Sequence, residues 1–173
     1  MIKPRTKQVV LTFKRNEILY DCKNYAYVEG DTMKTQDEHD RHQVMDIAED
    51  GNIDRVTRVL DLAFAACVEL CYPYSKVEVG NLTELDDTLT ERDNLVLTLL
   101  VPDDFSQTTV ELLRRLIHEL LVYKVMADWT SHTKPESEAK WEKKAEETEE
   151  KISSSLNYRV GRVRRTLSPF GPA

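Results

Sequence analysis

The sequence has little glycine, and this shortage excludes several classes of enzyme. Its 173 residues include five glycines, at positions 30, 51, 80, 161 and 171. None falls in the spacing of a P-loop or a dinucleotide-binding fingerprint, in which clustered glycines let the backbone approach phosphate. No pair of glycines flanks a serine as in a nucleophile elbow. We therefore expect neither those nucleotide-binding folds nor a hydrolase built on that turn.

Long hydrophobic runs and paired cysteines are also missing. No stretch approaches the roughly 20 apolar residues of a membrane span, and no apolar signal core follows the first seven residues. We expect a protein that stays in the compartment where it is made, or in a particle assembled there. The three cysteines cannot form a closed disulfide framework. Cys67 and Cys71 lie four apart in an apolar helical pattern, which predicts buried, reduced thiols.

Residues with the spacing of a catalytic or metal site are likewise scarce. His39 and His42 share one helical face near several acidic residues, but a structural zinc site needs four ligands and no others lie at suitable spacing. His118 and Glu119 match half of a zinc-protease motif, yet Val122 stands where the second histidine belongs. The sequence therefore predicts no catalytic residues, no metal and no cofactor, and a protein that is not an enzyme.

The chain is acidic overall, with a formal net charge of −7. This balance argues against nucleic acid binding over the whole surface, although a local basic segment remains able to bind phosphate. Tyr20, Tyr25 and Tyr27 form a small tyrosine-rich group beside Lys23. We interpret them as residues of a half-buried sheet rather than as a base-stacking platform.

The N-terminal third predicts strands. Apolar residues alternate with polar ones over 7–13, and two further short apolar runs follow at 18–20 and 25–28, each after a polar break. A turn at 29–31 would close this region. We expect two or three short strands here, with Cys22 among them.

From residue 37 onward the period becomes helical. We expect a short helix that stops at Gly51, then a second helix capped by Asn52 and ended by Pro73. The apolar face of the first helix consists of Val44, Ile47 and Ala48. The apolar stripe of the second consists of Ile53, Val56, Leu60, Ala63, Phe64, Cys67 and Cys71.

Residues 75–101 predict a long hairpin. Its first arm carries Val77 and Val79, and its second carries alternating leucines that begin at Leu95. Between the arms lies an acidic segment, 82–93, with little to bury. This tip fits either a mobile surface loop or a finger that contacts a partner.

Two long helices follow. Ser106 is a suitable cap for the first, which should run to about Trp129 and whose apolar positions cover more than one narrow stripe, as in a central helix. Thr133 and Glu136 predict a capping box around Pro135 at the start of the second. The second helix has a thin apolar seam that suits a single neighbour. The seam consists of Trp141, Ala145, Thr148, Ile152 and Leu156.

The last segment, 157–173, is a basic and apolar arm on an acidic protein. It contains four arginines and no acid, and its prolines at 169 and 172 prevent a continuous helix. Guanidinium groups among apolar anchors suit docking in a groove of another subunit. A disordered basic tail is the alternative. The predicted partner-binding residues are Arg159, Arg162, Val163, Arg164, Arg165, Leu167 and Phe170.

Together these elements predict an α+β fold that is mainly α. We expect one helical-bundle domain over 1–156, with N-terminal strands and a hairpin at 75–101, and a C-terminal docking arm over 157–173. The domain is long enough to bury a core of its own.

The arrangement is similar to the head-to-tail connector proteins of tailed bacteriophages. Residues 11–21 (LTFKRNEILYD), 24–31 (NYAYVEGD), 54–60 (DRVTRVL) and 160–170 (VGRVRRTLSPF) resemble small structural proteins of phages that infect gut Bacteroides, including the crAss-like group. The resemblance covers most of the chain and rests on overall pattern.

This resemblance implies a virion protein at the portal vertex, assembled in the cytoplasm of a bacterial host. It implies a homo-oligomeric ring of twelve copies under the portal protein, next to other neck and tail proteins. Genomic DNA would pass through the ring without sequence-specific contact, and no membrane is involved. A small nucleic-acid-binding protein that uses the arginine-rich tail is the alternative, followed by an enzyme without a recognisable motif.

Overall fold

Over its described residues the protein is mainly helical with a small two-stranded antiparallel sheet, which confirms the predicted fold class. The computed structural model describes residues 6–34, 38–72, 74–75 and 93–157. The elements are β1 (Thr6–Lys14), α1 (Arg15–Asp31), α2 (Glu38–Met45), the 3-10 turn η1 (Asp46–Ala48), α3 (Asp50–Leu70), β2 (Asn94–Pro102), α4 (Gln107–Thr133) and α5 (Pro135–Asn157).

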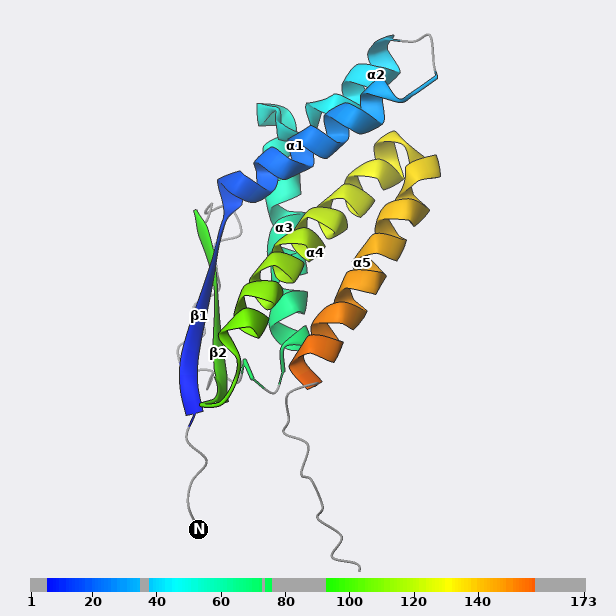
Figure 1. The fold of residues 1–173 in the computed structure, drawn as a ribbon. Coiled ribbons are helices and arrows are strands. Elements are labelled where there is room, and N and C mark those ends of the chain that lie inside the picture. The colour runs from blue at the N-terminus through cyan, green and yellow to red at the C-terminus, as the bar shows by residue number, and fades with distance from the viewer. Residues whose placement is uncertain (1–5, 35–37, 73, 76–92, 158–173) are drawn as a thin grey trace, which may run out of the picture.

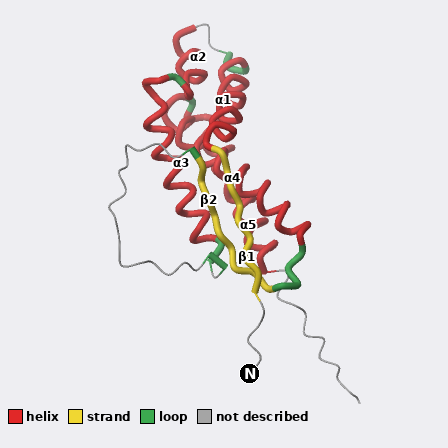
Figure 2. Tube along the Cα trace, turned by 90° about the vertical axis from the view of Figure 1, so that its left-hand side faces the viewer, coloured by secondary structure: helices red, strands yellow, loops and turns green. Residues whose placement is uncertain are grey.

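The sheet consists of β1 and β2, which pair in antiparallel register. Lys14 lies opposite Asn94 and Thr6 opposite Pro102. Because side chains alternate across a strand, one face of the pair is buried. That inner face carries Leu11, Phe13, Leu95, Leu97, Leu99 and Val101, which are all buried. The sheet covers one side of the helices (Figure 2).

Helix α4 is the centre of the fold. It contacts α5, α3, α1, α2 and β1, and its buried residues point in several directions. In Figure 1, α1 lies above α4, α3 lies behind α4, and α5 runs alongside it. The prediction of a central helix with neighbours on more than one side is therefore confirmed.

Helix α5 packs through the predicted narrow seam. Each of its five seam residues, Trp141, Ala145, Thr148, Ile152 and Leu156, is buried. They recur every three or four positions, so they form one stripe along the helix that faces α4. Most other residues of α5 are Glu and Lys.

The prediction of strands over 18–20 and 25–28 is wrong, because these residues belong to α1. The buried positions Ile18, Cys22 and Ala26 are four apart, which is a helical spacing. The exposed tyrosines 20 and 27 raise the local strand propensity, but burial of this stripe against the bundle decides the conformation. Residues 29–31 form the last turn of α1 rather than a turn between strands.

The predicted helix ends in the middle region are also wrong. The short helix ends at Met45 and continues as η1, so Gly51 lies in the first turn of α3. Glu49, not Asn52, is the N-cap residue of α3. The side chain of Asn52 instead donates a hydrogen bond from Nδ2 to the backbone oxygen of Asp46 at 2.9 Å. Asn52 thus fastens the start of α3 to η1.

The capping box at Thr133 does not form. Helix α4 continues one turn beyond Trp129 to Thr133, whose Oγ1 donates to the backbone oxygen of Trp129 at 2.9 Å. Helix α5 begins at Pro135, which suits the first position of a helix because it lacks an N–H. Ser106 is the N-cap of α4 as predicted, although its side chain makes no capping bond.

The second arm of the predicted hairpin is β2, and its described partner is β1, about 80 positions away in the sequence. The first arm, with Val77 and Val79, lies outside the described residues, as does the acidic tip up to residue 92 and Pro73. At the opposite edge of β2, the N–H of Leu100 donates to the backbone oxygen of Tyr74 at 2.7 Å.

Candidate functional site

The seven predicted partner-binding residues of the C-terminal arm lie outside the described residues, which end at Asn157. The described body offers four features that bear on function. They are an apolar face of the sheet, a polar groove between β1, α1 and α4, an ionic cluster, and an aromatic group around a lysine.

The outer face of the sheet carries an apolar patch. Val10, Val96 and Leu100 are 48%, 52% and 46% exposed, and we call these three residues the sheet patch. Val10 lies opposite Thr98, which places it diagonally between Val96 and Leu100 on the same face. Alternation in the sequence indicates that these side chains point outward. Only the pairing register of β1 and β2 shows that they lie next to one another.

A polar groove of about 500 Å³ lies where β1 runs into α1 beside α4. It is lined by Thr12, Phe13, Lys14, Glu17, Arg114, Arg115, His118 and Glu119. His118 Nε2 and Asp21 Oδ2 are 2.8 Å apart and link α4 to α1. The half-motif seen in the sequence at His118 and Glu119 thus faces a groove, where His118 pairs with a carboxylate.

Charges of both signs line this groove. Lys14 pairs with Glu17 at 2.8 Å. Arg114 and Arg115 are exposed and form no ion pair with any described residue. A second hollow of about 390 Å³ continues past His118 to Tyr20 on α1. The groove provides donors and acceptors for a polar partner but places no nucleophile against His118.

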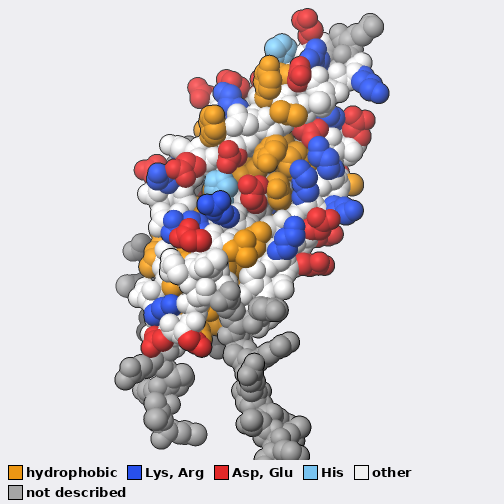
Figure 3. All heavy atoms as spheres, in the orientation of Figure 1, with side chains coloured by type: hydrophobic (Ala, Val, Ile, Leu, Met, Phe, Trp, Pro, Cys, Tyr) orange, Lys and Arg blue, Asp and Glu red, His pale blue; other side chains and the backbone are white. Residues whose placement is uncertain are grey.

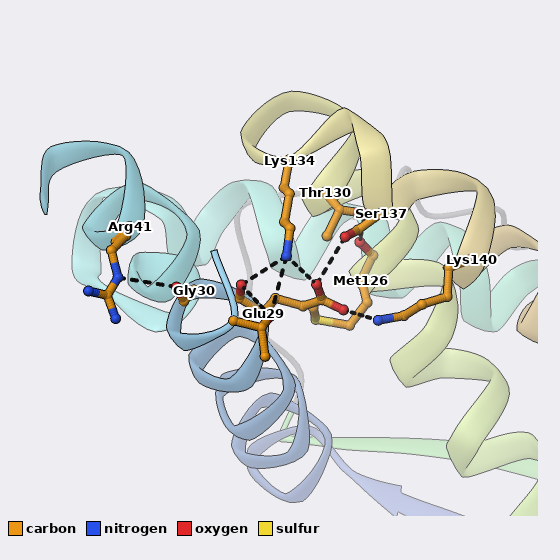
Figure 4. A network of polar contacts seen from close by, with 9 residues as sticks. Glu29, Gly30, Arg41, Met126, Thr130, Lys134, Ser137 and Lys140 are labelled. Carbon is orange, nitrogen blue, oxygen red and sulfur yellow. Dashed lines mark hydrogen bonds and ion pairs between the residues drawn. The ribbon is translucent and has the colours of Figure 1, made fainter. Parts of the chain in front are cut away.

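An ionic cluster around the buried side chain of Glu29 joins the end of α1 to the turn between α4 and α5 (Figure 4). Glu29 Oε2 accepts hydrogen bonds from Lys134 Nζ and Ser137 Oγ, each at 2.9 Å. Its other carboxylate oxygen accepts a hydrogen bond from Lys140 Nζ. Lys134 Nζ also donates to the backbone oxygen of Glu29 at 3.0 Å. We call Glu29, Lys134, Ser137 and Lys140 the Glu29 cluster.

The cluster keeps Glu29 ionised. Burial opposes the charge on its carboxylate, but the hydrogen bonds from Lys140, Lys134 and Ser137 outweigh burial and lower its pKa to about 2. A satisfied buried ion pair fixes geometry more than it adds stability. The Glu29 cluster therefore sets the position of α1 against the α4–α5 turn, and sequence alone gives no signal for it because charged residues are abundant.

An aromatic group surrounds the end of Lys144. Its Nζ lies 4.3 Å from the ring centre of Trp141, 5.4 Å from that of Tyr123 and 5.8 Å from that of Tyr25. Tyr25 and Trp141 meet edge to face, with 5.1 Å between ring centres. Through this contact Tyr25, one of the three tyrosines noted in the sequence, packs α1 against α5. Tyr20 and Tyr27, by contrast, are exposed on α1.

The remaining candidates from the sequence occupy ordinary positions. His39 and His42 are exposed on α2, and His39 Nε2 lies 3.0 Å from Gln43 Nε2. Within the described ranges, no group of three or more His, Cys, Asp or Glu side chains is placed to hold a metal ion. Cys67 and Cys71 are free and buried, as predicted. Cys22 is also free and buried, but it lies in α1 rather than in a strand. Burial raises the pKa of Cys67 to about 12 and that of Cys71 to about 11.

The exposed surface mixes both charges. In Figure 3, Lys and Arg side chains alternate with Asp and Glu side chains over the visible face, and smaller hydrophobic patches lie between them. None of the helices in the described ranges is both long enough and apolar enough to cross a bilayer. Searches against protein-family models, curated proteins and solved structures find no match to the chain.

Proposed function

We propose that the protein is a structural subunit that assembles with copies of itself into a ring, in the head-to-tail connector of a tailed bacteriophage. The observation that carries the assembly is the sheet patch. The connector role itself rests on the resemblance of residues 11–21, 24–31, 54–60 and 160–170 to phage structural proteins.

The two-stranded sheet has an apolar outer face that a second subunit would cover. An isolated pair of strands is marginally stable in water, and within the described ranges this pair packs on the rest of the fold through one face. Among the described residues no strand pairs with the second edge of β1, so its N–H and C=O groups are also open to a neighbour. Contact with another subunit would cover Val10, Val96 and Leu100 together.

A ring requires two different surfaces on each subunit. In a closed cyclic assembly the contact is heterologous, so the sheet patch of one copy would meet another surface of the next. Figures 1 and 2 place the sheet on one side of α4, with α5 away from it. The net acidic chain is compatible with a channel for DNA, because carboxylates repel phosphates, while the arm carries four arginines and no acid and would dock on protein.

The test is the oligomeric state of the purified full chain and of two matched variants. Val96→Lys places a charge in the sheet patch, and Val28→Lys changes a valine of similar exposure, 57%, at the end of α1. We expect the unmodified chain and Val28→Lys to form rings by negative-stain imaging and mass photometry, and Val96→Lys to remain monomeric with an unchanged melting temperature.

A chain that stays monomeric at tens of micromolar, or rings that survive Val96→Lys, would contradict the proposal. DNA binding that weakens steeply between two salt concentrations, without rings, would instead support the nucleic-acid-binding alternative.

A further inference from the structure

A groove separate from the sheet patch lies between α3 and α5, over α4. Its volume is about 290 Å³. The lining residues are Ala63, Ala66, Cys67, Glu69 and Leu70 of α3, Leu120 and Lys124 of α4, and Glu149 of α5. Small alanine side chains on α3 leave room between the two outer helices, and we call this space the alanine groove.

The alanine groove is apolar at its floor and acidic at its rim. Leu120 and Cys67 are buried beneath it, and Ala66 is exposed along its wall. At the rim, Lys124 Nζ pairs with Glu149 Oε1 at 2.8 Å. Glu69 is exposed and has no ionic partner among the described residues. One lysine thus faces two carboxylates, which leaves the rim negative.

We propose that the alanine groove receives the C-terminal segment 158–173 of a second copy of this chain. The proposal rests on the assembly proposed above and names the surface that the arm occupies. The segment combines four arginines, no acid, and apolar side chains, so its chemistry complements an apolar floor with a negative rim. Leu167 or Phe170 would fill the space beside Ala66, and a neighbouring arginine would pair with Glu69.

The position where α5 ends indicates that the segment in the alanine groove comes from a second copy rather than from the same chain. Glu149 is eight positions before Asn157, which is about 12 Å along a helix at 1.5 Å per residue. An extended chain that reversed direction would cover this distance in about four residues. In that case the alanine groove would meet residues 158–161 of its own chain. Leu167 and Phe170 would then lie roughly 20 and 30 Å beyond the groove, too far to fill it. A reach of about 50 Å for sixteen extended residues suffices for a neighbour.

The test is photo-crosslinking in the full-length chain. Phe170 is replaced by the photoreactive residue benzoylphenylalanine, and equal amounts of ¹⁵N-labelled and unlabelled protein are mixed in denaturant and refolded together before illumination. We expect crosslinked peptides that join position 170 to residues 63–70 of α3. About half of them should pair a labelled with an unlabelled chain, because random mixing within an oligomer gives that share.

Matched variants test whether the arm binds in the alanine groove. Ala66→Arg fills it, whereas Ala65→Arg changes the neighbouring exposed alanine, which does not line it. We expect Ala66→Arg to lower the crosslink yield about tenfold, equivalent to about 1.4 kcal/mol of docking free energy. Glu69→Lys should lower the yield as well. Ala65→Arg should leave it unchanged, and all three variants should keep the melting temperature of the unmodified protein.

Two outcomes would overturn the inference while leaving the proposed function intact. Rings that form but carry crosslinks from position 170 to another surface would place the arm elsewhere. Crosslinks at α3 that never mix the two isotopes would show that each chain binds its own arm. A protein that forms no oligomer and gives no mixed crosslink would contradict both proposals.

Discussion

Lys134 Nζ lies 2.9 Å from Glu29 Oε2, although 105 positions separate the two residues in the sequence. Both side chains are buried, with exposed fractions of 8% and 5%. The pair ties the last turn of α1 to the short connection between α4 and α5. Because Lys134 is buried and its carboxylate partner is Glu29, removing Glu29 leaves the charge of Lys134 uncompensated.

Glu29→Gln should therefore lower the free energy of unfolding by about 3–5 kcal/mol, as expected when a buried ion pair loses one partner. Chemical denaturation at neutral pH measures this change. The exposed pair of Arg55 and Asp128 provides a control, because Asp128→Asn should cost less than about 1 kcal/mol. Equal, small effects of the two variants would show that the Glu29 cluster does not hold α1.

The pH dependence of stability gives an independent check on Glu29. Its pKa is 4.5 as a free side chain and about 2 in the fold, so the folded state favours the ionised form. The stability from this group is present above pH 4.5 and is lost as the pH falls towards 2. Thermal melts across this range should show a smaller decline for Glu29→Gln than for the unmodified chain. An identical decline in both would assign acid unfolding to other carboxyl groups.

Trp141→Ala should cost about 3–5 kcal/mol, because Trp141 is 1% exposed and contacts Tyr25, Tyr123 and Lys144. Trp141→Phe keeps an aromatic ring in the seam and should cost only about 1–2 kcal/mol. Urea denaturation followed by circular dichroism measures both. A loss below about 1 kcal/mol for Trp141→Ala would mean that the seam of α5 does not hold this helix on α4.

Two glycines should respond in opposite directions to alanine. A Cβ at Gly30 would lie 2.8 Å from Met45 Cγ and 3.1 Å from the backbone oxygen of Arg41, so Gly30→Ala should destabilise the protein by about 1–3 kcal/mol. A Cβ at Gly51 meets nothing within 4 Å, so Gly51→Ala should stabilise it by about 0.4–1 kcal/mol. Melting temperatures that move the same way in both variants would contradict the close approach of α1 and α2.

Docking of the arm on protein should depend on its apolar residues as much as on its arginines. Leu167→Ala and Phe170→Ala should each weaken ring assembly at physiological salt about as strongly as Arg164→Ala combined with Arg165→Ala, because buried anchors dominate interface energy. Sedimentation velocity measures the fraction assembled. Assembly that survives both apolar changes, but is lost with the arginine pair and falls steeply with salt, would indicate phosphate binding instead.

The sequence predicted elements whose periodicity is unambiguous. The alternation over 7–13 identified β1, and the seam from Trp141 to Leu156 identified the buried face of α5. The strand prediction over 18–20 and 25–28 is wrong because tyrosine and valine favour strands, and only Ile18, Cys22 and Ala26 show the helical spacing of the buried face. Burial against the bundle, which a local pattern does not contain, decides such a segment.

Pairings between distant residues were not predictable. Alternation over residues 94–102 shows that this strand has a buried face, but it does not identify β1 as the partner. Likewise, Glu29 is one of 31 acidic residues, and nothing in the sequence marks it as the one that meets Lys134. The features of the candidate surfaces depend on such pairings, so the sheet patch and the alanine groove became visible only in the folded structure.

The order of the strands also has a consequence for synthesis. Among the described elements β1 is made before the others, and its partner β2 begins 80 positions after β1 ends. At a translation rate of about 5–20 residues per second, β1 waits roughly 4–16 s without a partner. During that time, neighbouring nascent chains on one mRNA each carry an unpaired β1 with Leu11 and Phe13 exposed. The β1 strands of different chains are then able to pair with one another. Slower translation across residues 15–93 should therefore lower the yield of native protein.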